Sequence, residues 1–168
     1  SWSASNREKV AVVGTVGVPA SYGGLETLVD QIIVQDELSW TVYCSSIHYD
    51  VFPRTYKKAN LIYIPLSANG PVSVVYDIFS ILHAIFSGHR QFLILGTSGA
   101  IIIPIIKFLI PSSHMVTNID GIEWRREKWQ GFLAKRFLKF SERLAVKYSS
   151  VVIADNEIIA EYVDKEYQ

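Results

Sequence analysis

The chain has 168 residues, nearly half of them hydrophobic, which suits one compact domain and excludes a disordered protein. Its 16 lysine and arginine residues balance 16 acidic residues, and a net charge of zero argues against a dedicated nucleic-acid-binding protein. The single cysteine, Cys44, has no partner for an internal disulfide, and the longest apolar run, 99–111, is too short to span a bilayer. We therefore expect a cytoplasmic protein.

Short apolar strands alternate with helices along the chain. The pattern predicts a polar leader without a signal peptide at 1–8, followed by a strand at 9–14, a glycine-rich loop at 15–24 and a helix at 25–35. It then predicts strands at 40–44 and 61–65, a helix at 72–86, a strand at 92–96 and a helix at 100–109. The last predicted elements are a strand at 115–119, a basic helix at 132–148, a strand at 151–154 and a helix at 158–166. This alternation predicts the α/β class, with a single domain over 9–168 built as a Rossmann-like, doubly wound parallel sheet with helices on both faces.

Ligands of doubly wound sheets bind beyond the carboxyl ends of the strands, so the loops that follow strands are the candidate sites. The first loop, 14–26, places Gly23 and Gly24 at a helix N-terminus, where backbone N–H groups can meet a phosphate or a sugar hydroxyl. Its glycine spacing is neither the dinucleotide fingerprint nor a P-loop. Alternatively, the glycines only make the turn, and Glu26 only stabilises the first helical turn.

The second loop, 119–129, carries an acid, aromatic rings and bases in a short stretch. Asp120 directly follows a strand, Trp124 can stack on a sugar ring, and Arg125 can neutralise phosphate. Gly121 and Glu123 belong to the same predicted substrate-binding set. The alternative is a solvated loop whose tryptophans pin the following helix, but this density of groups favours a functional role.

The third loop, 96–99, places the hydroxyls of Thr97 and Ser98 before a helix, which suits a ligand but is also what an ordinary strand-to-helix turn requires. No Cys and His residues lie at metal-ligand spacing, so we expect no metal.

The helix at 132–148 is basic: eight of the 16 lysines and arginines lie between Arg125 and Lys147. Core packing explains the apolar stripe of most such helices. The cations also suit peripheral contact with an anionic membrane while the helix packs on the sheet.

The stretches VGTVGVPASYGGLETLVDQI and NIDGIEWRREKW resemble the N-terminal domain of bacterial rhamnosyltransferase-like family 4 glycosyltransferases, a region long classified as a domain of unknown function. The resemblance extends over nearly the whole chain and implies the N-terminal half of a GT-B fold, in which two Rossmann-like domains face each other across a cleft. The C-terminal, donor-binding domain would be absent from this chain. The resemblance places contacts with the donor diphosphate or the acceptor on Gly17, Tyr22, Gly23 and Gly24.

Many relatives have His-Gly where this chain has Asp120-Gly121, so the resemblance makes Asp120 the candidate catalytic residue, acting either as a base or as a positioning group. It also implies retaining transfer without metal or cofactor, from a dTDP- or UDP-linked sugar to a lipid-linked saccharide at the inner face of the cell membrane. The enzyme would build a capsule or other surface polysaccharide, and the isolated domain would be inactive.

Two rival functions remain at this stage. A nucleotide-cofactor oxidoreductase would need an acid after the second strand to hold the ribose, and the chain has Tyr43-Cys44-Ser45 there. A stand-alone saccharide- or nucleotide-binding module would use the same loops. The transferase requires that the natural polypeptide continue past Gln168 into a second domain, whereas the binding module does not.

Overall fold

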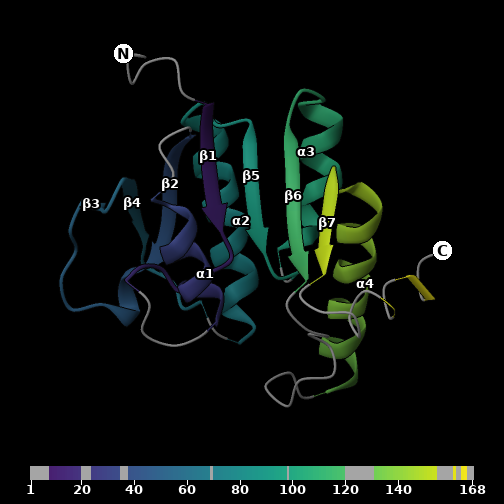
Figure 1. The fold of residues 1–168 in the computed structure, drawn as a ribbon. Coiled ribbons are helices and arrows are strands. Elements are labelled where there is room, and N and C mark those ends of the chain that lie inside the picture. The colour runs from purple at the N-terminus through teal and green to yellow at the C-terminus, as the bar shows by residue number, and fades with distance from the viewer. Residues whose placement is uncertain are drawn as a thin grey trace.

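The computed structural model describes residues 8–19, 24–34, 38–68, 70–97, 99–119, 131–154, 161 and 164–165. In this part of the chain, seven strands form one sheet, and helices α1 to α4 cover its two faces (Figure 1). The structure is thus an α/β fold of the Rossmann-like kind. None of the described helices combines the length and the hydrophobicity needed to cross a membrane.

The strands are β1 (Glu8–Val13), β2 (Leu38–Ser45), β3 (Thr55–Tyr56), β4 (Ala59–Ile64), β5 (Gln91–Leu95), β6 (His114–Ile119) and β7 (Val151–Ala154). The α-helices are α1 (Gly24–Ile32), α2 (Val72–Phe86), α3 (Ile103–Leu109) and α4 (Phe132–Tyr148). Two short 3₁₀ helices are η2 (Ser46–His48) and η3 (Ala100–Ile102).

The strand order across the sheet is β3-β4-β2-β1-β5-β6-β7. All neighbouring strands pair in parallel, except that the edge strand β3 pairs antiparallel with β4. From β1 the chain builds outward through β2 and β4, and it then returns to place β5 on the other side of β1. The order therefore reverses between β1 and β5, near the middle of the sheet.

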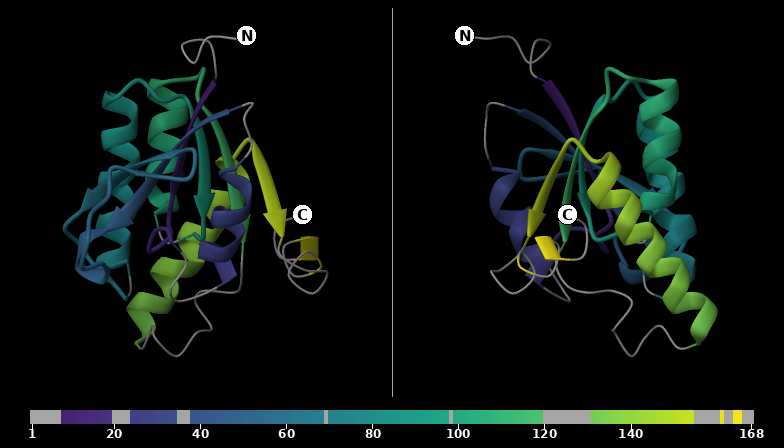
Figure 2. Two further views of the ribbon diagram at one scale, coloured as in Figure 1. Left: turned by 60° about the vertical axis from the view of Figure 1, so that its left-hand side comes forward. Right: turned by 90° about the vertical axis from the view of Figure 1, so that its right-hand side faces the viewer.

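Each face of the sheet has its own hydrophobic core. Successive strand residues point to opposite faces, so Ala11 and Val13 of β1 pack into one core while Val12 packs into the other. Helices α2, α3 and α4 cover the first face, and α1 covers the second (Figure 2). Because the central strands are buried on both faces, they are nearly continuous apolar runs in the sequence, which is why they were predictable.

The predicted strands and the first four predicted helices are confirmed, with ends that differ by up to three residues. The segment 100–109 is one helix in the prediction but η3 followed by α3 in the structure; Pro104 lies in the first turn of α3, where its missing N–H is tolerated. The prediction missed β3 and η2, which are too short to show a period. The helix predicted at 158–166 lies largely outside the described residues.

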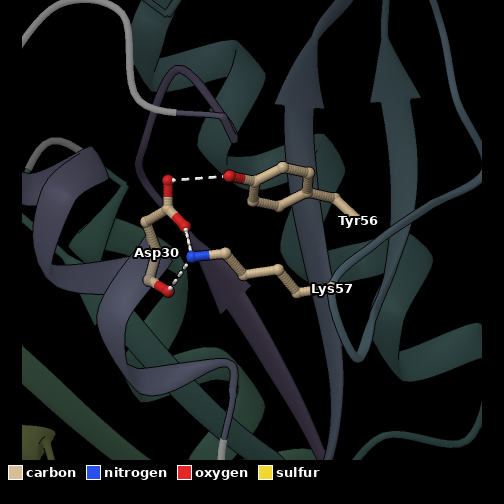
Figure 3. A network of polar contacts seen from close by, with 3 residues as sticks. All are labelled: Asp30, Tyr56 and Lys57. Atoms are coloured by element: carbon tan, nitrogen blue, oxygen red, sulfur yellow. Dashed lines mark hydrogen bonds and ion pairs between the residues drawn. The ribbon is translucent and has the colours of Figure 1, made fainter.

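A polar network attaches the unpredicted β3–β4 hairpin to α1 (Figure 3). Asp30 of α1 accepts a hydrogen bond from the Tyr56 hydroxyl, with 3.1 Å between the oxygens, and forms an ion pair with Lys57. The Lys57 ammonium also donates to the Asp30 carbonyl at 3.3 Å. The hydrogen bond to Asp30 raises the pKa of Lys57, although burial opposes this shift. These contacts orient an edge strand that pairs over only two residues.

Candidate functional site

The carboxyl ends of β1 and β5 form the switch point of the sheet. The two strands are parallel neighbours, with Val13 paired to Ile94. After β1 the chain passes to α1 on one face, and after β5 it passes through η3 to α3 on the other face. In doubly wound sheets, loops that leave in opposite directions at a switch point open a crevice where ligands bind. We call the position at the carboxyl ends of β1 and β5 the candidate crevice.

Glycine brings the two backbones close together at this point. Gly14 directly follows β1 and has φ +93°, and a Cβ placed on it would lie 2.1 Å from the carbonyl oxygen of Leu95, the last residue of β5. Gly96 follows β5, also with positive φ, and its N–H donates to the Asn118 carbonyl of β6 at 2.9 Å. Only glycine fits at position 14, since any side chain would push the two strand ends apart.

Three buried oxygens lie at the carboxyl ends of neighbouring strands without a hydrogen-bond partner among the described residues. They are Thr15 Oγ1 after β1, Thr97 Oγ1 after β5, and Asn118 Oδ1 near the end of β6. The three residues are only 1 to 5% exposed. A buried polar group without a partner costs about 1–3 kcal/mol, so each of these three atoms calls for a partner such as a water molecule, an ion or a ligand.

The loop after β1 packs onto the end of β2. The Val16 carbonyl accepts a hydrogen bond from the Ser45 N–H at 2.8 Å, and a Cβ on Gly17 would lie 2.8 Å from the Cys44 sulfur. Ser45 in turn donates from its hydroxyl to the Leu66 carbonyl at 2.5 Å. Cys44 and Ser45 are fully buried, and burial raises the pKa of the Cys44 thiol from 9.0 to about 11. The position after β2 that holds a ribose in dinucleotide enzymes is therefore filled by buried main-chain contacts.

Two polar residues of α2, Tyr76 and Asp77, contact the loops that follow β1 and β5. The Tyr76 hydroxyl lies 2.8 Å from the Thr15 carbonyl and 3.0 Å from the Tyr43 carbonyl. Asp77, 4% exposed, lies beneath the loop after β5, where a Cβ on Gly99 would approach its Cβ to 2.5 Å. Sequence reasoning missed both residues; their signal was a tyrosine and an acid within an otherwise apolar helix.

We expect Tyr76→Phe to lower the free energy of unfolding by about 1–3 kcal/mol, because the substitution removes a donor that two buried carbonyls share. Burial raises the pKa of Tyr76, so its hydroxyl stays protonated and can donate. Urea denaturation measures the loss. Tyr63→Phe is the matched control, since the Tyr63 hydroxyl donates at the surface to the Pro53 carbonyl. Equal losses in the two variants would contradict the bracing role of Tyr76.

The structure describes four of the predicted site residues, Gly17, Gly24, Glu26 and Thr97. Gly17 and Thr97 follow the neighbouring strands β1 and β5, and Gly24 begins α1. Glu26, in the first turn of α1, is 6% exposed and belongs to the buried part of the fold. Sequence analysis did not select Thr15, Asn118 or Asp77. For Thr15 and Asn118, the available signal was a polar residue at or next to the end of a predicted strand. The predicted residues that lie outside the described residues are Tyr22, Gly23, Ser98, Asp120, Gly121, Glu123, Trp124 and Arg125.

Two of the described histidines, His83 and His89, take part in hydrogen bonds within the fold. The Tyr43 hydroxyl lies 2.8 Å from Nδ1 of the exposed His83. His89 is buried, and its Nδ1 lies 3.2 Å from the Ala84 carbonyl, so this nitrogen donates and Nε2 accepts from Thr41. Burial lowers the pKa of His89. Within the described ranges, no three His, Cys, Asp or Glu side chains gather as a metal site would require.

Comparison with known proteins places the chain in a family. No curated protein matches the sequence. Over residues 7–168 it matches the family described as a domain of unknown function (DUF1972). The match spans every strand and helix that forms the crevice, and the chain belongs to the DUF1972 family.

Proposed function

We propose that this domain is the acceptor-binding half of a retaining, metal-independent glycosyltransferase, with rhamnosyl transfer as the reaction to test first. A second domain, outside this chain, would hold most of a dTDP- or UDP-linked donor and face the carboxyl edge of the sheet. The acceptor would be a lipid-linked saccharide, and the product a surface polysaccharide. The observation that carries the proposal is the set of three buried oxygens, without partners among the described residues, that lie at the carboxyl ends of β1, β5 and β6.

The chemistry of these oxygens suits a sugar. A threonine hydroxyl both donates and accepts hydrogen bonds, and an asparagine amide does so with two different atoms. Sugar hydroxyls and the oxygens of a diphosphate are the complementary groups. Thr15, Thr97 and Asn118 come from three adjacent strands, β1, β5 and β6, so one ligand that lies across the strand ends can satisfy all three.

The end of β2 argues against a nicotinamide-cofactor enzyme. Such an enzyme holds a ribose with an acid after the second strand and leaves room for the glycine-rich turn to approach a diphosphate. Here Ser45 is buried and bonded to Leu66, and Gly17 packs against Cys44. The space beside β2 is occupied, whereas the space beside β5 and β6 retains unpartnered groups.

The replacement Thr97→Val tests the proposal in the natural polypeptide that contains this domain. Valine has nearly the same shape as threonine but no hydroxyl, so the variant should unfold at a slightly higher temperature than the wild type. Transfer should weaken, because a hydrogen bond to a charged group contributes about 1.5–3 kcal/mol and about 1.4 kcal/mol is a tenfold change. We therefore expect a tenfold or larger fall in kcat/KM for sugar transfer from dTDP- and UDP-linked donors.

Ser141→Ala is the matched control. The Ser141 hydroxyl is also buried without a partner among the described residues, but it belongs to α4 rather than to a strand end. This variant should gain stability without loss of transfer. Unchanged kcat/KM in Thr97→Val would remove the Thr97 hydroxyl from the substrate site, and no sugar transfer by the wild-type polypeptide with any nucleotide sugar would overturn the proposal.

A further inference from the structure

Helix α2 exposes its apolar side chains and buries polar ones. Its buried residues include Ser73, Asp77 and Ser80, and its only charged residue, Asp77, is 4% exposed. The exposed side instead presents five large apolar side chains, spaced alternately three and four residues apart: Val72, Val75, Phe79, Leu82 and Phe86. Their exposed fractions range from 37% for Leu82 to 89% for Phe86. A surface helix normally shows the opposite polarity. An exposed apolar stripe of this kind is typical of a surface that binds another protein or a membrane.

Helix α3 extends the apolar surface. Ile105 is 55% exposed, Phe108 84% and Leu109 68%. The one charged residue of this helix, Lys107, donates to the Ser113 carbonyl and to the Ser150 hydroxyl. Figure 2 shows α2 and α3 in the same layer on one face of the sheet, so their outer sides turn away from the sheet together.

Helix α4, in the same layer, adds positive charge. Lys135, Arg136 and Arg143 are exposed, and together with Lys139 they line a hollow of about 370 Å³ that Phe132 and Phe140 complete. The only acid of α4, Glu142, is 1% exposed. All residues of α2, α3 and α4 are described, and neither of their two acids, Asp77 and Glu142, lies at the surface. An anion that approaches these three helices thus meets cations and aromatic rings, and none of the helices' own carboxylates is exposed there.

We propose that the outer sides of α2, α3 and α4 form a docking surface for an anionic phospholipid membrane. The side chains of α2 and α3 enter the boundary between headgroups and acyl chains, and the cations of α4 pair with lipid phosphates. A helix of 15 residues is about 22 Å long and too short to span the bilayer, so α2 lies parallel to the membrane plane. This surface goes beyond the proposed transferase function and does not depend on it.

The charge pattern favours a membrane over a second copy of the chain. The spacing of the α2 stripe also suits pairing of two helices. A two-fold interface, however, brings together identical surfaces, and the second copy would offer the α4 cations no exposed acid from these three helices. Anionic headgroups supply the complementary charge, and their attraction adds to the burial of apolar side chains.

Sedimentation with lipid vesicles tests the proposal on the chain itself. We expect the protein to bind vesicles that contain phosphatidylglycerol, to bind pure phosphatidylcholine vesicles at least tenfold more weakly, and to lose affinity in high salt. The triple variant Lys135→Gln, Arg136→Gln, Arg143→Gln should reduce binding to anionic vesicles at least tenfold. The control triple Lys9→Gln, Arg54→Gln, Lys58→Gln removes the same charge from β1 and the region around β3 and should bind as the wild type does.

The apolar contribution has its own pair of variants. Phe79→Ser with Phe86→Ser should weaken binding to anionic vesicles several-fold, whereas Val51→Ser with Phe52→Ser, which removes exposed apolar side chains elsewhere, should not. Light scattering reports the oligomeric state of every variant. Absence of vesicle binding, equal loss in both charge triples, or a dimer that Phe79→Ser with Phe86→Ser dissociates without any lipid binding would overturn the proposal.

Discussion

Gly14→Ala is expected to lower the free energy of unfolding by roughly 3–5 kcal/mol. A left-handed backbone costs a residue with a side chain about 1–2 kcal/mol, and overpacking typically adds about 1–3 kcal/mol. At position 14 the overpacking falls at the high end of this range, because the atom that a Cβ would meet at 2.1 Å is the Leu95 carbonyl oxygen and not a flexible side chain. Urea denaturation, followed by circular dichroism, measures the loss.

Gly88→Ala separates the two causes. Gly88 has φ +92° against +93° for Gly14, but a Cβ at position 88 would meet no atom within 4 Å. This variant should lose only the backbone part, about 1–2 kcal/mol. Similar losses at positions 14 and 88 would mean that the strand ends separate at little cost, and the close approach of β1 and β5 would then not define the crevice.

Asp120→Ala is expected to reduce sugar transfer by the natural polypeptide about 10²- to 10⁴-fold if the carboxylate acts as a general base. In the sequence, the residue directly follows β6 and stands two positions after Asn118. Thermal unfolding should stay close to that of the wild type, since the expected role is chemical. Near-normal transfer in this variant would remove Asp120 from the site.

Two further variants sharpen the test of Asp120. Asp120→Asn retains hydrogen bonding but cannot take a proton, so it should retain much of the activity if the carboxylate only positions the acceptor and the leaving diphosphate receives the proton. Glu8→Ala removes an exposed acid from the opposite, amino end of the sheet and should leave transfer unchanged. Loss of transfer in Glu8→Ala as well would indicate a general effect of charge rather than a site.

Local pattern was sufficient to predict most of the fold. The runs that became β1 and β5 are largely apolar because these strands are buried on both faces. α4 was predictable from its alternation of apolar and basic residues, and it begins and ends where the pattern predicts. β3 was not predictable, since two residues carry no period and its pairing depends on α1 through Asp30.

The candidate site was only partly predictable. Thr97 lies in a loop that the rule on the carboxyl ends of strands selects, whereas Gly17 was predicted from the family resemblance. Tyr76 and Asp77 lie within α2, and they reach the site because that helix turns its polar residues toward the sheet. The apolar period of α2 is visible in the sequence, but the period does not reveal which side faces the core, because both sides carry apolar side chains.

The sequence by itself determined the class of fold and the succession of strands and helices, and it predicted the loops in which a ligand site is expected. These properties follow from residues that are neighbours along the chain, through burial, period and turn chemistry. Only the tertiary structure decided that β5 lies beside β1, that Gly14 meets Leu95, and that Thr15, Thr97 and Asn118 are buried without partners. Such facts depend on contacts between segments far apart in the chain, and no local pattern records them.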